Sequence, residues 1–469
     1  MTAGPTFSDI LTATAKGWCA RKADEPVLSL AVRIKGVDPL CQLPLIAEKE
    51  QFRFLWDGSP GRCFAASGRC QSLDISGPRR FELAQRFSDV TLGRLIEITP
   101  EAPPYSNPRI LLAFSFFEQT SECQRTHGLP PAVQAVLPRW QLCQQGSQSW
   151  LRLTAVATHE AEARVLAEKL WLMSQSVTQI SEQKERILTN IGSVLSFPQQ
   201  WQDCYRPALI RGIDLVNHGI LDKLVLAVRQ SIWLETPLDP LGMLSRLRRQ
   251  QTGSCRFLWQ RTPDEVFFGA SPERLLSLRK GNLQIDALAG TATRQDDERS
   301  LLRSDKDLRE HELVVASIAN QLISEGLVPR RPRRPQLARH GHLVHLHTPI
   351  NAVAGDKSPL SLVGALHPTP AVAGFPRREA MTWLRTLEPF ERGSYAAPIG
   401  WIDNSGNAEF RVAIRCGMAR GRTLELTAGA GLVRGSIAQR ELQEVGLKLA
   451  VLADQLDIRS KRSSSRSIT

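Results

Sequence analysis

The stretch "LDKLVLAVRQSIWLE", residues 221–235, decides how the rest of the chain is interpreted. Its apolar run from Leu224 to Val228 has the length and the β-branched residues typical of a buried strand. Lys223 stands directly before that run. A lysine at a strand end usually extends its amine to solvent while its stem lies on apolar neighbours. A lysine that is buried instead favours its neutral form, which can accept a proton, so the remaining sequence has to decide between the two interpretations.

The composition is that of an ordinary globular protein. Of the 469 residues, 42% are hydrophobic and 23% are charged. No apolar run approaches the ~20 residues that a membrane helix needs, and the first residues lack a basic start followed by an apolar run. We therefore expect no membrane span and no secretory signal. The nine cysteines are scattered without a C-x-x-C pair, which indicates reduced thiols and a cytoplasmic location rather than a zinc site.

The net charge is basic, because 59 Lys and Arg residues face 47 Asp and Glu residues, giving +12. Much of the excess lies in two runs, "VPRRPRRPQLARHGH" (328–342) and "RSKRSSSRSIT" (459–469). We interpret the first as an inserted surface loop and the second as a disordered basic tail. Aromatic residues do not interleave with these charges, so we expect no nucleic-acid binding. A basic molecule that attracts small anionic substrates fits the charge equally well.

Alternating apolar stretches broken by Gly, Pro and Ser fill residues 1 to about 155, a pattern typical of an antiparallel sheet. Further strands follow residue 221 and recur near the end of the chain. No linker separates the two halves, so we predict one intertwined α+β fold in which large antiparallel sheets pack as a sandwich with helices outside. We divide it into a variable region (1–195), a catalytic region (196–457) and the tail (458–469). Helices are predicted at about 159–194, 202–218, 305–326, 377–387 and 438–457.

The last predicted helix carries Glu441, Glu444 and Lys448 on one face, at spacings of three and four residues. Such a stripe is commonly a solvated face with pairing between positions i and i+4. Here, however, it directly follows "TAGAGLV", where Gly429 and Gly431 would let backbone amides approach an anion. That context favours a functional role.

Two further carboxylates are candidates for chemistry. In "SDKDLREHELVV", Asp305 and Asp307 are explained as acidic residues at a helix start, whereas Glu310 lies deeper and is less well explained. Glu273 of "FFGASPERLL" follows a strand end. A carboxylate in a turn is commonplace, but apolar surroundings would raise its pKa and make it a general acid.

Four histidines lie in "HGHLVHLHTPI". If this segment is one strand, His340 and His342 share one face and His345 and His347 share the other. The four side chains then do not converge on a metal, and most of them are interpreted as ordinary strand residues.

Taken in order, these segments resemble the chorismate-utilising enzymes, and specifically the isochorismate synthases. The resemblance covers about residues 200–455, while the first ~190 residues carry no matching motif. The matching motifs are "DKLVLAVR", "FFGASPERLL", "ALAGTATR", "SDKDLREHELVV", "HLHTPI", "LHPTPAVAGFP", "YAAPIGW", "FRVAIRCG", "TAGAGLV" and "ELQEVGLKL".

The resemblance implies roles for the residues. Lys223 would activate a water that attacks C2 of chorismate, and Glu273 would protonate the leaving C4 hydroxyl. Mg²⁺, the expected cofactor, would be held by Glu310 and Glu444, with Glu441 in the same shell; hard carboxylate oxygens suit this ion.

The same resemblance implies an anion-binding set for the substrate. Arg415 and Lys448 would hold the enolpyruvyl carboxylate, because a guanidinium matches a carboxylate as a fork. Other residues would line the pocket: Ala289, Gly290, Thr291, His345, Tyr395 and Gly429. Chorismate is the expected partner, and a monomer or weak dimer is the expected state.

The nucleophile separates this branch from its neighbours. Aminodeoxychorismate synthases carry an attacking lysine where this chain has Ala289, and anthranilate synthases lack the lysine that activates water. The combination of Lys223 with Ala289 therefore points to water.

The sequence departs from the family pattern at three places. Ala397 and Ala373 replace glycines, and an added methyl group is easily accommodated only where φ is negative. An extra valine moves Arg229 out of register, so we do not place it in the site.

Two alternatives remain open at this point. A bifunctional salicylate synthase, which eliminates pyruvate from isochorismate in the same pocket, would share nearly all of these residues, although "LHPTPAV" looks more like the synthase-only branch. A catalytically dead homologue or a basic binding protein would have no need for both the acid–base pair and the metal ligands.

Overall fold

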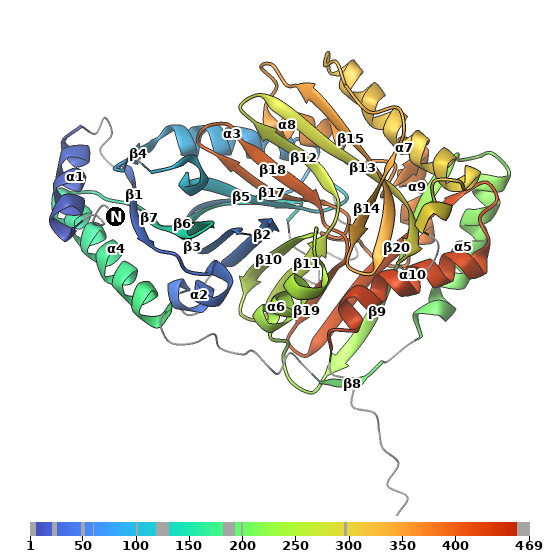
Figure 1. The fold of residues 1–469 in the computed structure, drawn as a ribbon, viewed down its shortest axis with the longest axis horizontal. Coiled ribbons are helices and arrows are strands. Elements are labelled where there is room, and N and C mark those ends of the chain that lie inside the picture. Colours follow the sequence, from blue (N-terminus) through green and yellow to red (C-terminus); the bar gives the residue numbers. More distant parts are fainter. Residues whose placement is uncertain are drawn as a thin grey trace, which may run out of the picture.

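The structure is a computed structural model that describes residues 6–20, 26–47, 52–59, 61–99, 102–118, 131–181, 193–197, 200–294 and 298–456. The predicted basic tail, 458–469, lies outside the described residues. Figure 1 shows strands running through the centre of the molecule, with helices on the outside. None of the described helices is long and apolar enough to cross a membrane.

Twenty strands are described. They are β1 (Val27–Lys35), β2 (Arg53–Ser59), β3 (Arg62–Ile75), β4 (Leu95–Glu97), β5 (Arg109–Phe114), β6 (Val133–Gln145), β7 (Gln148–Val156), β8 (Val194–Ser196), β9 (Lys223–Leu234), β10 (Cys255–Thr262), β11 (Glu265–Ser271), β12 (Arg274–Arg279), β13 (Asn282–Thr293), β14 (Gln336–His340), β15 (Leu343–Val353), β16 (Gly374–Phe375), β17 (Pro398–Asp403), β18 (Ala408–Val412), β19 (Cys416–Arg420) and β20 (Thr423–Val433). Every pairing among them is antiparallel except that of β1 with β4.

Hydrogen bonds connect these strands into one continuous sheet, which divides at β6 into two sheets. One edge of β6 pairs with β3 along its length. On the other edge, residues 133–136 pair with β5 and residues 140–145 pair with β7. From β5 one sheet continues through β17, β18, β12, β13 and β15 to β14. From β3 the other continues through β2, β10, β11, β19 and β20 to β9. The far ends of these two sheets provide the strands of the candidate site described below.

The described helices lie on the outer faces. They are α1 (Phe7–Cys19), α2 (Pro39–Ile46), α3 (Arg80–Gly93), α4 (Glu160–Ser181), α5 (Trp201–Asn217), α6 (Pro240–Gln250), α7 (Asp305–Ser324), α8 (Pro359–Leu366), α9 (Arg377–Leu387) and α10 (Ala438–Ala453). Helices α1 and α4 pack together at one end of the molecule, while α5 and α10 cover β9 and β20 at the other (Figure 1). Helix α7 packs on β13 and β15. The predicted α+β class with antiparallel sheets is therefore confirmed.

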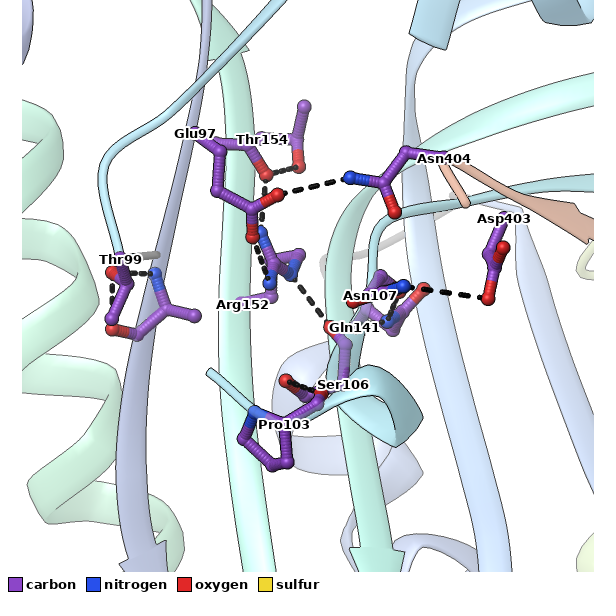
Figure 2. A network of polar contacts seen from close by, with 12 residues as sticks. Glu97, Thr99, Pro103, Ser106, Asn107, Gln141, Arg152, Thr154, Asp403 and Asn404 are labelled. Carbon is purple, nitrogen blue, oxygen red and sulfur yellow. Dashed lines mark hydrogen bonds and ion pairs between the residues drawn. The ribbon is translucent and has the colours of Figure 1, made fainter. Parts of the chain in front are cut away.

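A polar network, buried at Arg152 and exposed at Asn404, ties the first sheet strands to the C-terminal half. The Arg152 guanidinium, only 1% exposed, donates to Glu97 Oε1 at 2.7 Å, to Ser29 Oγ at 2.7 Å and to the Ser106 carbonyl at 2.9 Å. The Asn404 amide then donates to the second oxygen of Glu97 at 3.0 Å (Figure 2). These partners lie up to 307 residues apart, so the network connects distant segments of the chain.

Local sequence explains the helix that carries Glu310. Ser304 caps α7 by accepting a hydrogen bond from the Asp307 amide, and Asp305 and Asp307 occupy the first turn. Acidic residues there stabilise the positive end of the helix dipole. The interpretation of these two aspartates as helix-start residues is therefore confirmed.

Candidate active site

A cavity lies between the far ends of the two sheets, under α7 and α10. Its strand walls come from β9 and β20 of one sheet and from β13 and β15 of the other. Twelve of the thirteen site residues predicted from the sequence line it. They are Lys223, Glu273, Ala289, Gly290, Thr291, Glu310, His345, Tyr395, Arg415, Gly429, Glu444 and Lys448.

Lys223 is the first residue of β9 and is only 1% exposed. Its backbone pairs with Val433 of β20 on one side and with Phe375 of the short strand β16 on the other. Both edges of β9 are therefore covered at Lys223. Its ammonium lies 2.8 Å from Glu310 Oε1 of α7. The lysine is thus buried in the cavity, and the solvent-directed alternative is wrong.

Glu273 is the predicted acid, and it is 4% exposed. Its backbone amide donates to Ser271 Oγ and its carbonyl accepts from the Val412 amide, which fixes the strand end. Burial raises the pKa of Glu273 to about 8, and the charge of Asp286 adds to this, while nearby Lys223 opposes it. At neutral pH the carboxyl group therefore holds a proton that it can donate.

Arg415 and His345 form the basic wall of the cavity. Arg415 Nη2 lies 3.5 Å from His345 Nε2, and His345 Nδ1 lies 2.9 Å from the Gly290 carbonyl. Because arginine only donates and a carbonyl only accepts, His345 carries its proton on Nδ1 and accepts at Nε2. Burial and the charge of Arg415 hold the pKa of His345 well below its usual value, which agrees with a neutral ring. His345 therefore orients Arg415.

Lys448 of α10 provides a second cation in the cavity wall, next to Glu444. Lys448 Nζ donates to the Gly429 carbonyl at 2.8 Å and is paired with Glu444. Burial would raise the pKa of Glu444, but the charge and the hydrogen bond of Lys448 lower it below its ordinary value. Thr291 Oγ1 lies 3.4 Å from the same carboxylate.

The three predicted metal-binding carboxylates each contact a lysine in this structure. Glu310 pairs with Lys223, Glu444 pairs with Lys448, and Glu441 lies 2.9 Å from Lys306. Glu441 is buried but does not line the cavity; burial and the proximity of Glu444 raise its pKa. As these side chains stand, no group of three or more His, Cys, Asp or Glu residues within the described part of the chain is arranged to hold a metal ion.

The donor chemistry at this position nevertheless fits Mg²⁺. Glu310 and Glu444 both present carboxylate oxygens to the cavity, and these are the ligands that Mg²⁺ prefers. Gly431 leaves the space beside them open, because a Cβ atom there would lie 2.6 Å from Glu310 Oε1 and 3.1 Å from Lys223 Cε.

Comparison with known proteins identifies the family. The profile described as "Chorismate binding enzyme" matches residues 12–457. The chain belongs to this family.

Several curated members of the family are similar to the chain. It is 40% identical over 252 residues to the "Salicylate biosynthesis isochorismate synthase" of Pseudomonas aeruginosa, covering 52% of each chain. It is 38% identical over 263 residues to "Isochorismate synthase MenF" of Bacillus subtilis, covering 54% of this chain and 56% of that protein. It is 36% identical over 259 residues to "Isochorismate synthase EntC" of Escherichia coli K12, covering 54% and 66%. The matched part of the chain thus spans about half the length of the first two relatives.

The fold is also shared with solved structures. The menaquinone-specific isochorismate synthase MenF of Escherichia coli aligns with a TM-score of 0.74 at 24% identity, covering 95% of this chain and 99% of that one. Anthranilate synthase component I of Streptococcus pneumoniae aligns with a TM-score of 0.58 at 19% identity, covering 91% and 92%.

The departures from the family pattern are compatible with the backbone. Ala373 and Ala397 are not among the residues with positive φ; those positions fall on the neighbouring Gly374 (φ 140°) and Ala396 (φ 60°). Arg229 lies outside the cavity, where it donates to the Glu391 carbonyl. This chorismate-binding enzyme therefore keeps its cavity with the two alanines in place.

The sequence did not identify some residues that shape the site. Gly431 makes room for the Lys223–Glu310 pair, and apolar side chains such as Val225 and Ile414 complete the wall. Lys306 lies one helical turn before Glu310, so the spacing of four residues could have indicated that it shares a face with that glutamate.

Proposed function

We propose that the chain is an isochorismate synthase that converts chorismate reversibly to isochorismate in a Mg²⁺-dependent reaction. The observation that carries the proposal is that a buried lysine, Lys223, and a buried carboxyl group, Glu273, line one cavity with Arg415 and Lys448. Burial raises the pKa of that carboxyl group. A base, an acid and two cations are what the addition of water to a small dicarboxylate with loss of a hydroxyl group requires.

In the proposed reaction Lys223 accepts a proton from a water whose oxygen forms a bond to C2. Glu273 donates its proton to the C4 hydroxyl, which leaves as water while the ring double bonds shift. One water enters and one leaves, so the product is an isomer of the substrate. The reverse direction uses the same two groups with their proton roles exchanged.

The cationic wall would bind the substrate. Arg415, held by neutral His345, and Lys448, held by the Gly429 carbonyl, are placed to pair with a carboxylate. The backbone of Arg415 has a φ of 52°, a strained conformation that the surrounding structure maintains. Mg²⁺, held by Glu310 and Glu444 with Glu441 beside them, would neutralise the charge of the other carboxylate.

The chain has no lysine at the position from which an amine would attack the substrate in aminodeoxychorismate synthases. Ala289 occupies that place in the cavity wall. The curated relatives compared above are named isochorismate synthases, which agrees with the use of water.

The test is to incubate the purified chain with chorismate, with and without Mg²⁺, and to separate the products by liquid chromatography. Isochorismate in equilibrium with chorismate, formed only with Mg²⁺, is the expected result. Salicylate with an equal amount of pyruvate would replace the proposal with a bifunctional salicylate synthase. Absence of conversion, even with ammonium added, would refute it.

A further inference from the structure

A second cavity of about 260 Å³ adjoins the candidate active site. Pro272 and Leu288 line both cavities and form the wall between them. Residues of β2, β10, β12, β13, β14, β15 and β18 line the second cavity, together with the loop residues Gly253, Ser254 and Pro272. The reaction proposed above uses none of its polar side chains.

Three arginines line this cavity. Arg256, Arg274 and Arg411 face it together with a single carboxylate, Asp286. Two of the three arginines have firm partners, because Arg256 pairs with Asp57 and Arg411 with Glu409, each at 2.9 Å.

Arg274 is the arginine with spare capacity. Its contact with Asp286 is 3.6 Å, beyond hydrogen-bond distance, and Asp286 is already bonded to His347 at 3.1 Å. Arg274 lies directly opposite Arg411 across the β12–β18 pair. The Nε atoms of both arginines are buried without a hydrogen-bond partner among the described residues. Buried donors of this kind normally have a partner, so this pair is suited to an added anion.

Two histidines, His340 and His347, also line the cavity. Burial, with the charges of Arg415 and other neighbours, lowers the pKa of His340 to about 4, so its ring is uncharged at neutral pH. His340 Nδ1 lies 3.3 Å from Ser254 Oγ. Apolar surface comes from Pro272, Leu288 and Ala338. A ligand with one anionic group and a small, largely apolar ring matches this distribution.

We propose that this second cavity binds a small cyclic or aromatic carboxylic acid, with its carboxylate at Arg274 and Arg411, and that the bound acid modulates the neighbouring reaction. Pro272 and Arg274 immediately flank Glu273, so an occupant touches both neighbours of the proposed acid. Asp286 in the same cavity also acts electrostatically on Glu273. The modulation rests on the proposed function, whereas the binding does not.

Binding is tested by calorimetry with benzoate as the probe. We expect benzoate to bind the wild-type chain, and Arg274→Gln and Ala338→Leu to weaken its binding by at least about tenfold. The first variant removes the guanidinium proposed to bind the carboxylate, and the second fills the cavity with a larger apolar side chain, so the two test different features. Arg331→Gln changes an exposed arginine on the 325–335 loop and should bind benzoate like the wild type.

A variant of the first cavity, Lys448→Gln, tells the two sites apart. Benzoate binding that survives Lys448→Gln and is lost in Arg274→Gln supports the second site. No binding to the wild-type chain, or binding lost only in Lys448→Gln, would overturn the proposal.

Kinetics test the modulation. Benzoate should lower kcat without raising KM for chorismate, because it occupies a separate cavity. Purely competitive inhibition would place it in the first cavity and refute the modulating role. A chain that forms no isochorismate at all would refute the proposed function alone, since calorimetry decides the second site without turnover.

Discussion

The Lys223 ammonium lies 2.8 Å from the Glu310 carboxylate, although the two residues come from different layers of the fold, β9 and α7. The contact keeps two buried charges paired, which avoids the high cost of isolating either one. It also joins the proposed base to one of the proposed metal ligands. An ammonium cannot accept a proton, so the proposed reaction requires Lys223 to give up both this contact and its own proton before it acts as the base.

Lys223→Ala should abolish turnover while chorismate still binds. Removing a general base typically costs about 10²–10⁴-fold in rate, whereas the binding cations Arg415 and Lys448 remain. Steady-state kinetics and equilibrium dialysis of chorismate measure the two effects separately. Lys357→Ala, at an exposed lysine paired with Glu325, is the matched control. A Lys223→Ala variant with normal kcat would eliminate this lysine as the base.

Glu273→Gln should be inactive and should gain stability relative to the wild type as pH rises. Burial raises the pKa of Glu273 from its ordinary 4.5 to about 8. The carboxyl group therefore contributes its full stability below about pH 4.5 and loses it progressively as pH rises through about 8. Glutamine does not ionise, so the difference in free energy of unfolding between variant and wild type should grow by about 1.4 kcal/mol per pH unit between these values.

Urea unfolding at pH 5 and pH 8 measures this difference. Glu168→Gln, at an exposed position in α4, is the control that measures how removing one exposed glutamate changes the free energy of unfolding. The wild-type rate should also fall as pH rises through about 8, because the proton to be donated is lost. A Glu273→Gln variant whose relative stability does not change with pH would contradict the buried acid.

Glu444→Gln should weaken the response to Mg²⁺ and lower activity together, since the substitution removes a proposed ligand charge and also releases Lys448. A Mg²⁺ titration of activity and direct calorimetry of Mg²⁺ binding provide two readouts. Glu312→Gln on α7, which changes an exposed glutamate paired with Arg331, is the control. An unchanged Mg²⁺ titration would exclude Glu444 as a ligand.

Gly431→Ala should impair catalysis without unfolding the protein. The added methyl group would lie 2.6 Å from Glu310 Oε1 and displace the Lys223–Glu310 pair, and we expect a loss of at least about tenfold in kcat. Gly446→Ala is the contrasting variant, because its methyl group would meet only Trp201 at 3.7 Å, an ordinary contact. Equal activity of the two variants would show that the space beside Glu310 is not needed.

The sequence predicts elements better than it predicts their contacts. The α9 helix begins and ends where the pattern places it, at 377–387, and α5 lies within one residue of the predicted range. The long helix predicted at 159–194 is described only as 160–181, and the rest falls outside the described residues. The periodic spacing of apolar residues predicts where a helix lies, because these residues form the face of the helix that is buried.

The histidine segment shows where local reasoning fails. His340 ends β14 and His345 lies on β15, because Gly341 turns the chain with a φ of 62°. The expectation of a single strand is therefore wrong, although His345 and His347 do share one face of β15. One faces the first cavity and the other faces the second. The prediction of a surface loop over 328–342 is also wrong for Gln336–His340, because these residues form β14 and pair with β15.

The side-chain contacts within the site could not be predicted from the sequence for a related reason. The orientation of Arg415 by His345 joins residues 70 positions apart, and that pairing depends on which strands become neighbours. The family motifs indicated which side chains would meet in one cavity. They did not indicate that each predicted metal-binding carboxylate would form an ion pair with a lysine.

The divergence of the sheets at β6 bears on whether the second half of the chain could fold as a separate fragment. The half of the chain that carries the motifs borrows backbone partners from the other half, because β10 pairs with β2 and β17 pairs with β5. A fragment beginning near residue 196 would present two long unpaired strand edges, which favour aggregation. Backbone hydrogen bonds also place little demand on side-chain identity. The early strands therefore serve the catalytic half through their backbones, and removing them would cost it more than substituting their side chains.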